Sequence, residues 1–128
     1  MNEKNVEINN NLKWPPSEEE GELTIDLYET ENELVLESVV GGVKISDLDI
    51  SITNDMITIK GKRVKEDQEK IEKVYYNECF WGPFSRSLIL PKEINADKAK
   101  ATLKNGLLTI RLPKVEKTKE KILKIVEE

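Results

Sequence analysis

Apolar and polar residues alternate along the middle of the chain with the period of two that is typical of half-buried β-strands. The pattern begins at residues 23–29, where Leu23, Ile25 and Leu27 share one face. Six further segments carry strand patterns, namely residues 33–40, 47–53, 56–62, 84–90, 98–104 and 107–112. No stretch has the spacing of a convincing amphipathic helix, so the pattern predicts an all-β domain.

Residues that favour turns separate these segments. Gly-Gly at 41–42 and Asn-Asp at 54–55 interrupt the pattern, and Asn-Gly at 105–106 is a strong signal for a type I′ hairpin turn. Residues 29–32 predict another hairpin turn, and residues 95–97 predict one helical turn or a tight corner. Short strands at this spacing predict an antiparallel, immunoglobulin-like β-sandwich.

One connection is much longer than the others. Residues 63–73 are nearly all charged, and an aromatic cluster follows at residues 74–81 before Gly82 and Pro83 end it. Connections of this length without strands of their own are unusual inside a compact domain and are often functional. We therefore expect this loop to have a role beyond joining two strands.

The two ends of the chain lack the strand pattern. Residues 1–21 are polar and predict a flexible arm, residues 22–114 form the predicted sandwich, and residues 115–128 form a tail that carries a small apolar island. Trp14 lies in the arm, and two interpretations of it stay open. It packs locally on the domain, or it contacts another protein.

Composition and charge narrow the class of partner. The chain has 128 residues, the size of one domain, and its net charge is −5 with 35% charged residues. Net acidity argues against nucleic-acid binding, which usually leaves a basic footprint. No apolar run approaches the roughly 20 residues of a membrane span, and the polar start of the chain is unlike a secretory signal. We expect a cytoplasmic protein.

The residue types of common enzyme chemistry are sparse. The chain contains no His, so the commonest general base and metal ligand are missing and no serine has a histidine to activate it. No Cys or His pair has metal-ligand spacing, and no glycine-rich phosphate loop is present. The sequence therefore predicts no catalytic residue, metal, cofactor or small-molecule substrate, and a small hydrolase is a disfavoured alternative.

Cys79 is the only cysteine, so an intrachain disulfide is impossible and a reducing compartment is the simplest inference. Its aromatic neighbours favour a small buried or half-buried filler. A redox sensor is the alternative.

Arg86 is a charge among apolar neighbours. In strict alternation it shares a face with Phe84, Leu88 and Leu90. A guanidinium in such surroundings needs carboxylates or carbonyl groups as partners. We favour a structural arginine that bridges strands or subunits over an arginine that is solvated at a sheet edge.

Three motifs in a fixed order carry a resemblance to a known family. Residues 101–108 read A-T-L-K-N-G-L-L, which is similar to an A-x-x-x-n-G-v-L signature. Residues 84–91 read F-S-R-S-L-I-L-P, which is similar to F-x-R-x-x-x-L-P, and residues 47–61 match a strand pair of the same family. Together, over residues 22–114, they resemble the α-crystallin domain of small heat-shock proteins. The long aromatic loop favours the bacterial and archaeal branch.

The resemblance implies an ATP-independent holdase chaperone that binds partly unfolded client proteins and limits their aggregation under stress. It also implies a homodimer that assembles into a larger homo-oligomer. A strand in the loop would pair with the sheet of a neighbouring subunit in a two-fold dimer. The residues of this strand are Val74, Tyr75, Tyr76, Asn77, Glu78 and Cys79.

The resemblance also gives the tail a role. Leu123 and Ile125 are the best match to the family's Ile/Val-x-Ile/Val motif, with Ile122 and Val126 leaving the register open. They would dock in a groove that a client could also occupy. The residues of this groove are Leu48, Ile50, Ile52, Ala99, Ala101 and Leu103. The alternative is that these six residues only face the core.

The chain departs from the family pattern at two places. Gly-Gly at 41–42 replaces the usual Pro-Gly, which predicts a looser turn, and the amino-terminal arm is shorter and more polar than usual. The short arm argues against very large assemblies and against strong client binding by the arm. A rival interpretation is a p23-like co-chaperone or adaptor sandwich that binds a native partner, and the long loop argues against it.

Overall fold

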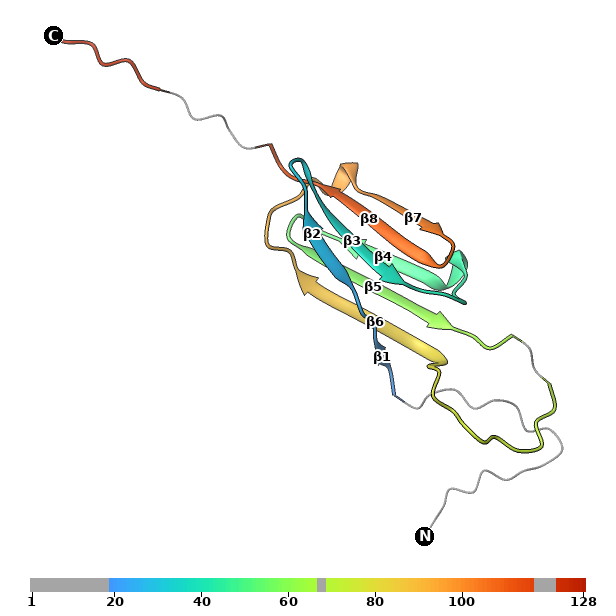
Figure 1. Cartoon of the computed structure of the whole chain (residues 1–128). Coiled ribbons are helices and arrows are strands. Elements are labelled where there is room, and N and C mark those ends of the chain that lie inside the picture. Colours follow the sequence, from blue (N-terminus) through green and yellow to red (C-terminus); the bar gives the residue numbers. More distant parts are fainter. Residues whose placement is uncertain (1–18, 67–68, 117–121) are drawn as a thin grey trace.

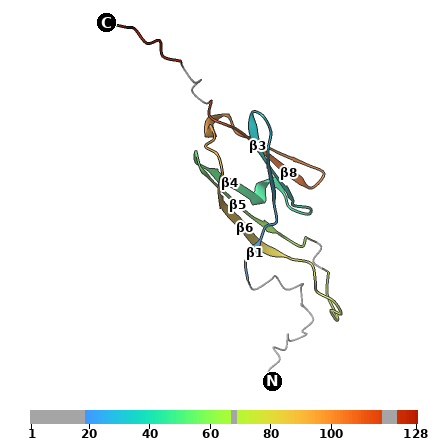
Figure 2. The ribbon, with the colours of Figure 1, turned by 60° about the vertical axis from the view of Figure 1, so that its left-hand side comes forward.

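The fold is a sandwich of two four-stranded β-sheets in a computed structural model that describes residues 19–66, 69–116 and 122–128 (Figure 1). Seen from a second direction, the sheets form two separate layers (Figure 2). The antiparallel sandwich that the alternation predicts is therefore confirmed. Trp14 and most of the predicted arm lie outside the described residues.

The first sheet has the strand order β1-β6-β5-β4, which are Gly21–Glu22, Gly82–Ile89, Met56–Arg63 and Leu48–Ile52. The second has the order β2-β3-β8-β7, which are Asp26–Glu29, Glu33–Val39, Leu107–Pro113 and Lys100–Lys104. Two short 3-10 helices, η1 (Ile45–Asp47) and η2 (Ala96–Lys98), precede β4 and β7. Neighbouring strands are antiparallel, except that β1 runs parallel to β6.

The core fills the space between the two sheets. Alternate residues of the central strands point inward, such as Leu34 and Leu36 of β3, Ile57 and Ile59 of β5, and Ile110 of β8. Each such side chain contributes roughly 1.5–3 kcal/mol when it is fully buried. Since a slip of one residue would turn all of these groups toward water, the alternation also sets the strand register.

The first predicted strand is shorter than expected, because its first three residues cross between the two sheets. Residues 23–29 were expected to form one strand, but only Asp26–Glu29 do so, as β2, which pairs with β3 in the second sheet, while the preceding β1 pairs with β6 in the first. The chain crosses at residues 23–25, where Leu23 N–H donates to Ser85 O (3.1 Å) and Ser38 Oγ donates to Thr24 O (2.7 Å). The alternation survives because Leu23, Ile25 and Leu27 all pack against the core on both sides of the crossing.

The turns follow the predicted chemistry. Asn105 and Gly106 both have positive φ angles (51° and 78°), as a type I′ turn requires. At residues 95–98, the Asn95 side chain accepts a hydrogen bond from Asp97 N–H and begins η2. The Gly-Gly turn at 41–42, which was expected to be loose, is closed by a hydrogen bond from Val43 N–H to Val40 O (3.1 Å).

Candidate interaction surfaces

The edges of the two sheets are the places where backbone groups can still accept another strand. Strands β1 and β4 are the edges of the first sheet, and β2 and β7 are the edges of the second. β1 and β2 are joined directly by the crossing at residues 23–25, so β4 and β7 lie together at the other side of the sandwich. The sandwich therefore has two sides with free strand edges, one formed by β1 and β2 and the other by β4 and β7.

The side formed by β4 and β7 carries the six residues predicted to line a groove, and we name it the β4–β7 surface. Leu48, Ile50 and Ile52 are half-buried and pack against the core, and so do Ala99 and Leu103. Ala101 is exposed although it lies in phase with Leu103. Five of the six side chains therefore pack against the core and remain partly exposed. Docking of a tail or client there stays a prediction.

The β5–β6 loop extends beyond the sheets, away from the β7 and β8 strands (Figures 1 and 2). In this single chain residues 74–79 form no strand, and the side chains of Tyr75 and Tyr76 are 79% and 81% exposed. Cys79 is also exposed, so the expectation of a buried or half-buried filler is wrong. The reason is that the loop leaves the sandwich and has no core of its own to fill.

The base of this loop is held by packing and by one arginine. The ring of Phe80 lies so close to Gly21 that a Cβ there would sit 2.8 Å from Phe80 Cζ. Arg63 Nε donates to Gly41 O (2.7 Å), and an Arg63 guanidinium N–H donates to Phe80 O (3.4 Å). The loop therefore starts and ends at defined points, although its tip is exposed.

One ion pair lies at the start of the β5–β6 loop. Lys44 Nζ lies 2.5 Å from Glu66 Oε1, and this hydrogen bond raises the pKa of Lys44 above its usual value. Both side chains are well exposed, so we expect the pair to add little to stability.

Arg86 bridges two parts of the subunit. It is half-buried on β6, donates a hydrogen bond to Leu23 O (3.0 Å) and lies 3.5 Å from Glu22 Oε1. It thereby ties β6 to the segment that crosses between the sheets, which is the kind of partner an arginine among apolar neighbours needs. A contact of Arg86 with another subunit stays a prediction.

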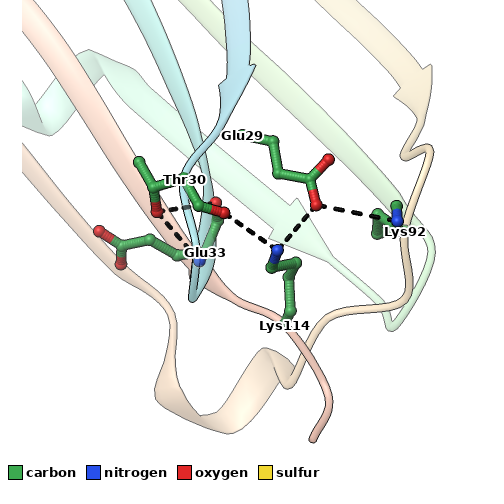
Figure 3. Close-up of polar contacts among 5 residues, drawn as sticks. All are labelled: Glu29, Thr30, Glu33, Lys92 and Lys114. Atoms are coloured by element: carbon green, nitrogen blue, oxygen red, sulfur yellow. Dashed lines mark hydrogen bonds and ion pairs between the residues drawn. The ribbon is translucent and has the colours of Figure 1, made fainter. Parts of the chain in front are cut away.

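The root of the tail is fixed by a polar network that the sequence analysis did not identify (Figure 3). Lys114 Nζ donates to Glu29 Oε2 (2.7 Å) and to Thr30 O (3.0 Å), and Lys92 Nζ lies 3.8 Å from the same carboxylate oxygen. Lys114 N–H also donates to Asn32 O (2.9 Å). No local pattern could reveal these contacts, because Lys114 and Glu29 are 85 positions apart.

The apolar residues of the tail contact nothing that would hide them from water. Leu123 and Ile125 are 77% and 93% exposed, and Ile122 and Val126 are similarly open. Residues 122–128 contain no helix or strand. The register of the tail motif therefore stays open between these neighbouring positions.

The described residues were also compared with the requirements of a metal site and of a membrane-spanning helix. Among residues 19–66, 69–116 and 122–128, no group of three His, Cys, Asp or Glu side chains could hold a metal ion. Within the same ranges, no helix is long and apolar enough to cross a bilayer.

Comparison with known proteins agrees with this architecture. Residues 26–127 match the model of the Hsp20/alpha crystallin family. Small heat shock protein C2 of Rickettsia felis is 36% identical over 100 residues, which cover 78% of this chain and 65% of that protein. The chain spans between 59% and 65% of the length of the first three curated relatives that it matches.

Solved structures show the same fold. Heat shock protein 16.0 from Schizosaccharomyces pombe superposes with a TM-score of 0.69 at 32% identity, covering 84% of this chain and all of that one. A small heat-shock protein from Xylella fastidiosa superposes with a TM-score of 0.68 at 27% identity, covering 82% of this chain and 96% of that one. The sandwich, its long loop and these matches lead to one assignment, that this chain belongs to the Hsp20/alpha crystallin family.

Proposed function

We propose that this protein is an ATP-independent, non-enzymatic holdase chaperone of the cytoplasm that binds partly unfolded proteins and suppresses their aggregation. The observation that carries the proposal is the β4–β7 surface, where half-buried apolar side chains lie along two strand edges. Membership of the Hsp20/alpha crystallin family supports it.

The physical basis lies in what an unfolding client exposes. Apolar side chains and unpaired strand edges come into contact with water, and both promote aggregation. The β4–β7 surface can cover the first by burial and the second by strand addition. Each leucine-sized side chain that is buried contributes roughly 1.5–3 kcal/mol, so a few weak contacts are enough for reversible binding.

The same proposal includes self-association into dimers. Residues 74–79 would form a strand that pairs with the sheet of a second copy, and reciprocal exchange would close a two-fold dimer. The free edge of β2 suits this role, because β1 is only two residues long and the edges of β4 and β7 belong to the β4–β7 surface. The exposed rings of Tyr75 and Tyr76 would then gain a partner.

The tail would join dimers into a larger homo-oligomer. Leu123 and Ile125 are exposed, and in an extended segment they would lie on the same side, so they could insert together at the β4–β7 surface of another dimer. Tail and client would then compete for one surface, and release of the tail would uncover it.

An aggregation assay tests the proposed function. A heat-labile enzyme is warmed with and without the full chain in the absence of ATP, and we expect light scattering to fall as the chaperone is added. Ala101→Asp places a charge on the β4–β7 surface at an exposed site, so we expect roughly fivefold more protein to be needed, equivalent to about 1 kcal/mol.

The matched control is Thr102→Asp, which adds the same charge to the neighbouring exposed residue on the other face of β7. It should protect the enzyme as well as the unsubstituted chain does. Equal scattering with and without the protein would contradict the holdase function, and equal effects of the two variants would contradict the choice of surface.

A further inference from the structure

A small hollow lies on the outer face of the second sheet, where β2 begins. It has a volume of about 130 Å³ and is lined by Thr24, Ile25, Asp26, Glu37, Ser38, Val39 and Leu107. Pairing of β2 with β3 starts only at Asp26 and Glu37, so the last two residues of β3 have no neighbour on that side. The hydrogen bond from Ser38 Oγ to Thr24 O holds the crossing segment beside the hollow.

One wall of the hollow is apolar and open to water. Val39 and Leu107 lie directly opposite each other on β3 and β8, and the side chain of Val39 is 71% exposed. A valine this open, next to a leucine that is also exposed, loses part of the hydrophobic free energy that burial would give. An apolar group that entered the hollow would cover both residues.

The rim of the hollow carries a pair of like charges. Asp26 and Glu37 face each other across β2 and β3, and both alternate with residues that point into the core. Like charges placed directly opposite in a sheet are destabilising. No lysine or arginine among the described residues forms an ion pair with either carboxylate. The hollow therefore suits a ligand that combines an apolar or aromatic group with a positive charge.

The β5–β6 loop contains that combination. Lys73 Nζ lies 5.2 Å from the centroid of the Tyr75 ring, so a cation and an exposed aromatic ring stand side by side. We propose that the hollow of one subunit receives Tyr75 of a second copy, with Lys73 of that copy paired to Asp26 and Glu37. This inference rests on the proposed strand exchange, and it sets where along β2 the incoming strand begins.

The position of the hollow supports this occupant. Asp26 is both the first residue of β2 and part of the rim, so the hollow continues directly into the free edge that would receive residues 74–79. In the proposed pairing the incoming strand runs parallel to β2, so that its first residues lie beside the hollow. Charge complementarity of this kind sets register and partner choice more than raw affinity.

A charge exchange between two variants tests the proposal. One variant carries Lys73→Glu, and the other carries Asp26→Lys together with Glu37→Lys. The second variant keeps a like-charged pair across β2 and β3 and reverses only its sign. The repulsion within the subunit should therefore be similar to that in the original chain. We expect each variant alone to have a dimer dissociation constant raised by about tenfold.

Mixed together, the two variants should form a heterodimer as readily as the original chain forms its homodimer. In that heterodimer both hollows face a loop of opposite charge, while each homodimer has two mismatched sites. Native mass spectrometry resolves the species if the variants differ in isotopic label. Lys70→Glu makes the same charge change elsewhere in the loop and should leave the homodimer unchanged.

Tyr75→Ala and Tyr76→Ala provide an independent measurement that avoids changes of charge. Adjacent residues of an extended strand point to opposite faces. Tyr75→Ala should therefore weaken the dimer by about tenfold, and Tyr76→Ala should weaken it less. If the charge variants and Tyr75→Ala dimerise normally but no longer protect a client protein from aggregation, the proposal is overturned, since the hollow would then bind clients.

Failure of this inference can be told apart from failure of the strand exchange. Tyr76→Pro and Asn77→Pro remove two successive backbone donors, which point to opposite sides of a strand. One of them should abolish the dimer if residues 74–79 pair with β2. If dimers still form in both proline variants, the strand exchange is contradicted. If a proline variant abolishes the dimer but the charge variants leave it unchanged, only the role of the hollow is contradicted.

Discussion

The β5–β6 loop and the C-terminal tail both carry apolar side chains that the sandwich leaves exposed. The points where they join the sandwich, the loop root at Phe80 and the tail root at Lys114, are held in different ways. Near the end of the loop lies Phe80, whose ring packs over Gly21 of β1. The tail begins after Lys114, whose ammonium is bound by Glu29 and Thr30 (Figure 3). The loop root thus includes the packing of a ring in addition to the hydrogen bonds of Arg63, whereas the side-chain contacts of the tail root are charged.

This difference has a physical consequence. Packing of a ring against a glycine depends on fit, and salt hardly changes it, whereas ion pairs near a surface weaken as ionic strength rises. The loop root should therefore stay in place under conditions that loosen the tail root. If the protein assembles through both segments as proposed, the larger assembly would respond to ionic strength before the dimer does.

The largest expected effect comes from removing the tail's apolar residues. Deletion of residues 122–128 should leave dimers but reduce any larger assembly, because the insertions at the β4–β7 surface are lost. Light scattering coupled to chromatography measures the mass. Leu123→Ala with Ile125→Ala should have the same effect, and Ile122→Ala with Val126→Ala should not. An unchanged mass in the deletion variant would contradict tail docking.

The next effect is expected at the loop root. Gly21→Ala would bring Cβ to 2.8 Å from the Phe80 ring, so we expect a loss of about 1–3 kcal/mol in the free energy of unfolding. Urea denaturation measures this change. Gly41→Ala is the matched control, because a Cβ at Gly41 has nothing within 4 Å. If both variants are equally stable, the loop root is not held by this contact.

The smallest effect is expected at the tail root. Lys114→Met keeps the length of the side chain and removes its charge, which should cost about 0.5–1.5 kcal/mol because the bonds to Glu29 and Thr30 are partly open to water. Hydrogen exchange should then speed up at the amides of Lys114 and Val115, which bond to Asn32 and Glu93.

Two comparisons check that interpretation of Lys114. Lys114→Arg should restore slow exchange, and Lys100→Met, at an exposed position on β7, should have no effect. Raising the salt concentration should reproduce the Lys114→Met result in the original chain while leaving the loop root unchanged. Exchange that is insensitive to both the substitution and salt would mean that the backbone bonds alone hold the tail.

Much of the fold could be predicted, because it depends on neighbours in the sequence. The alternation of Ile57 and Ile59 marked β5, and Asn105-Gly106 marked a turn whose positive φ angles the structure contains. The crossing of residues 23–25 between the two sheets could not be predicted. One continuous strand, and a short strand preceded by a crossing, would both turn Leu23 and Leu27 toward the same core. The hydrophobic pattern therefore cannot distinguish these two arrangements.

The candidate sites divide in the same way. The apolar residues of β4 and β7 were predicted because the strand period places them in phase, and all of them except Ala101 pack against the core with part of their surface open. Cys79 was expected inside because of its aromatic neighbours, and it is exposed because the loop leaves the sandwich. Local composition does not reveal whether a loop lies on a core or extends from it.

The sequence by itself determined the strands, the turns, the family resemblance and the apolar segments outside the core, since each depends on residue types at short spacing. Only the tertiary structure decided which distant residues meet. It paired Lys114 with Glu29 and placed Phe80 over Gly21. These contacts join positions far apart in the chain, and they exist because two sheets pack on one core.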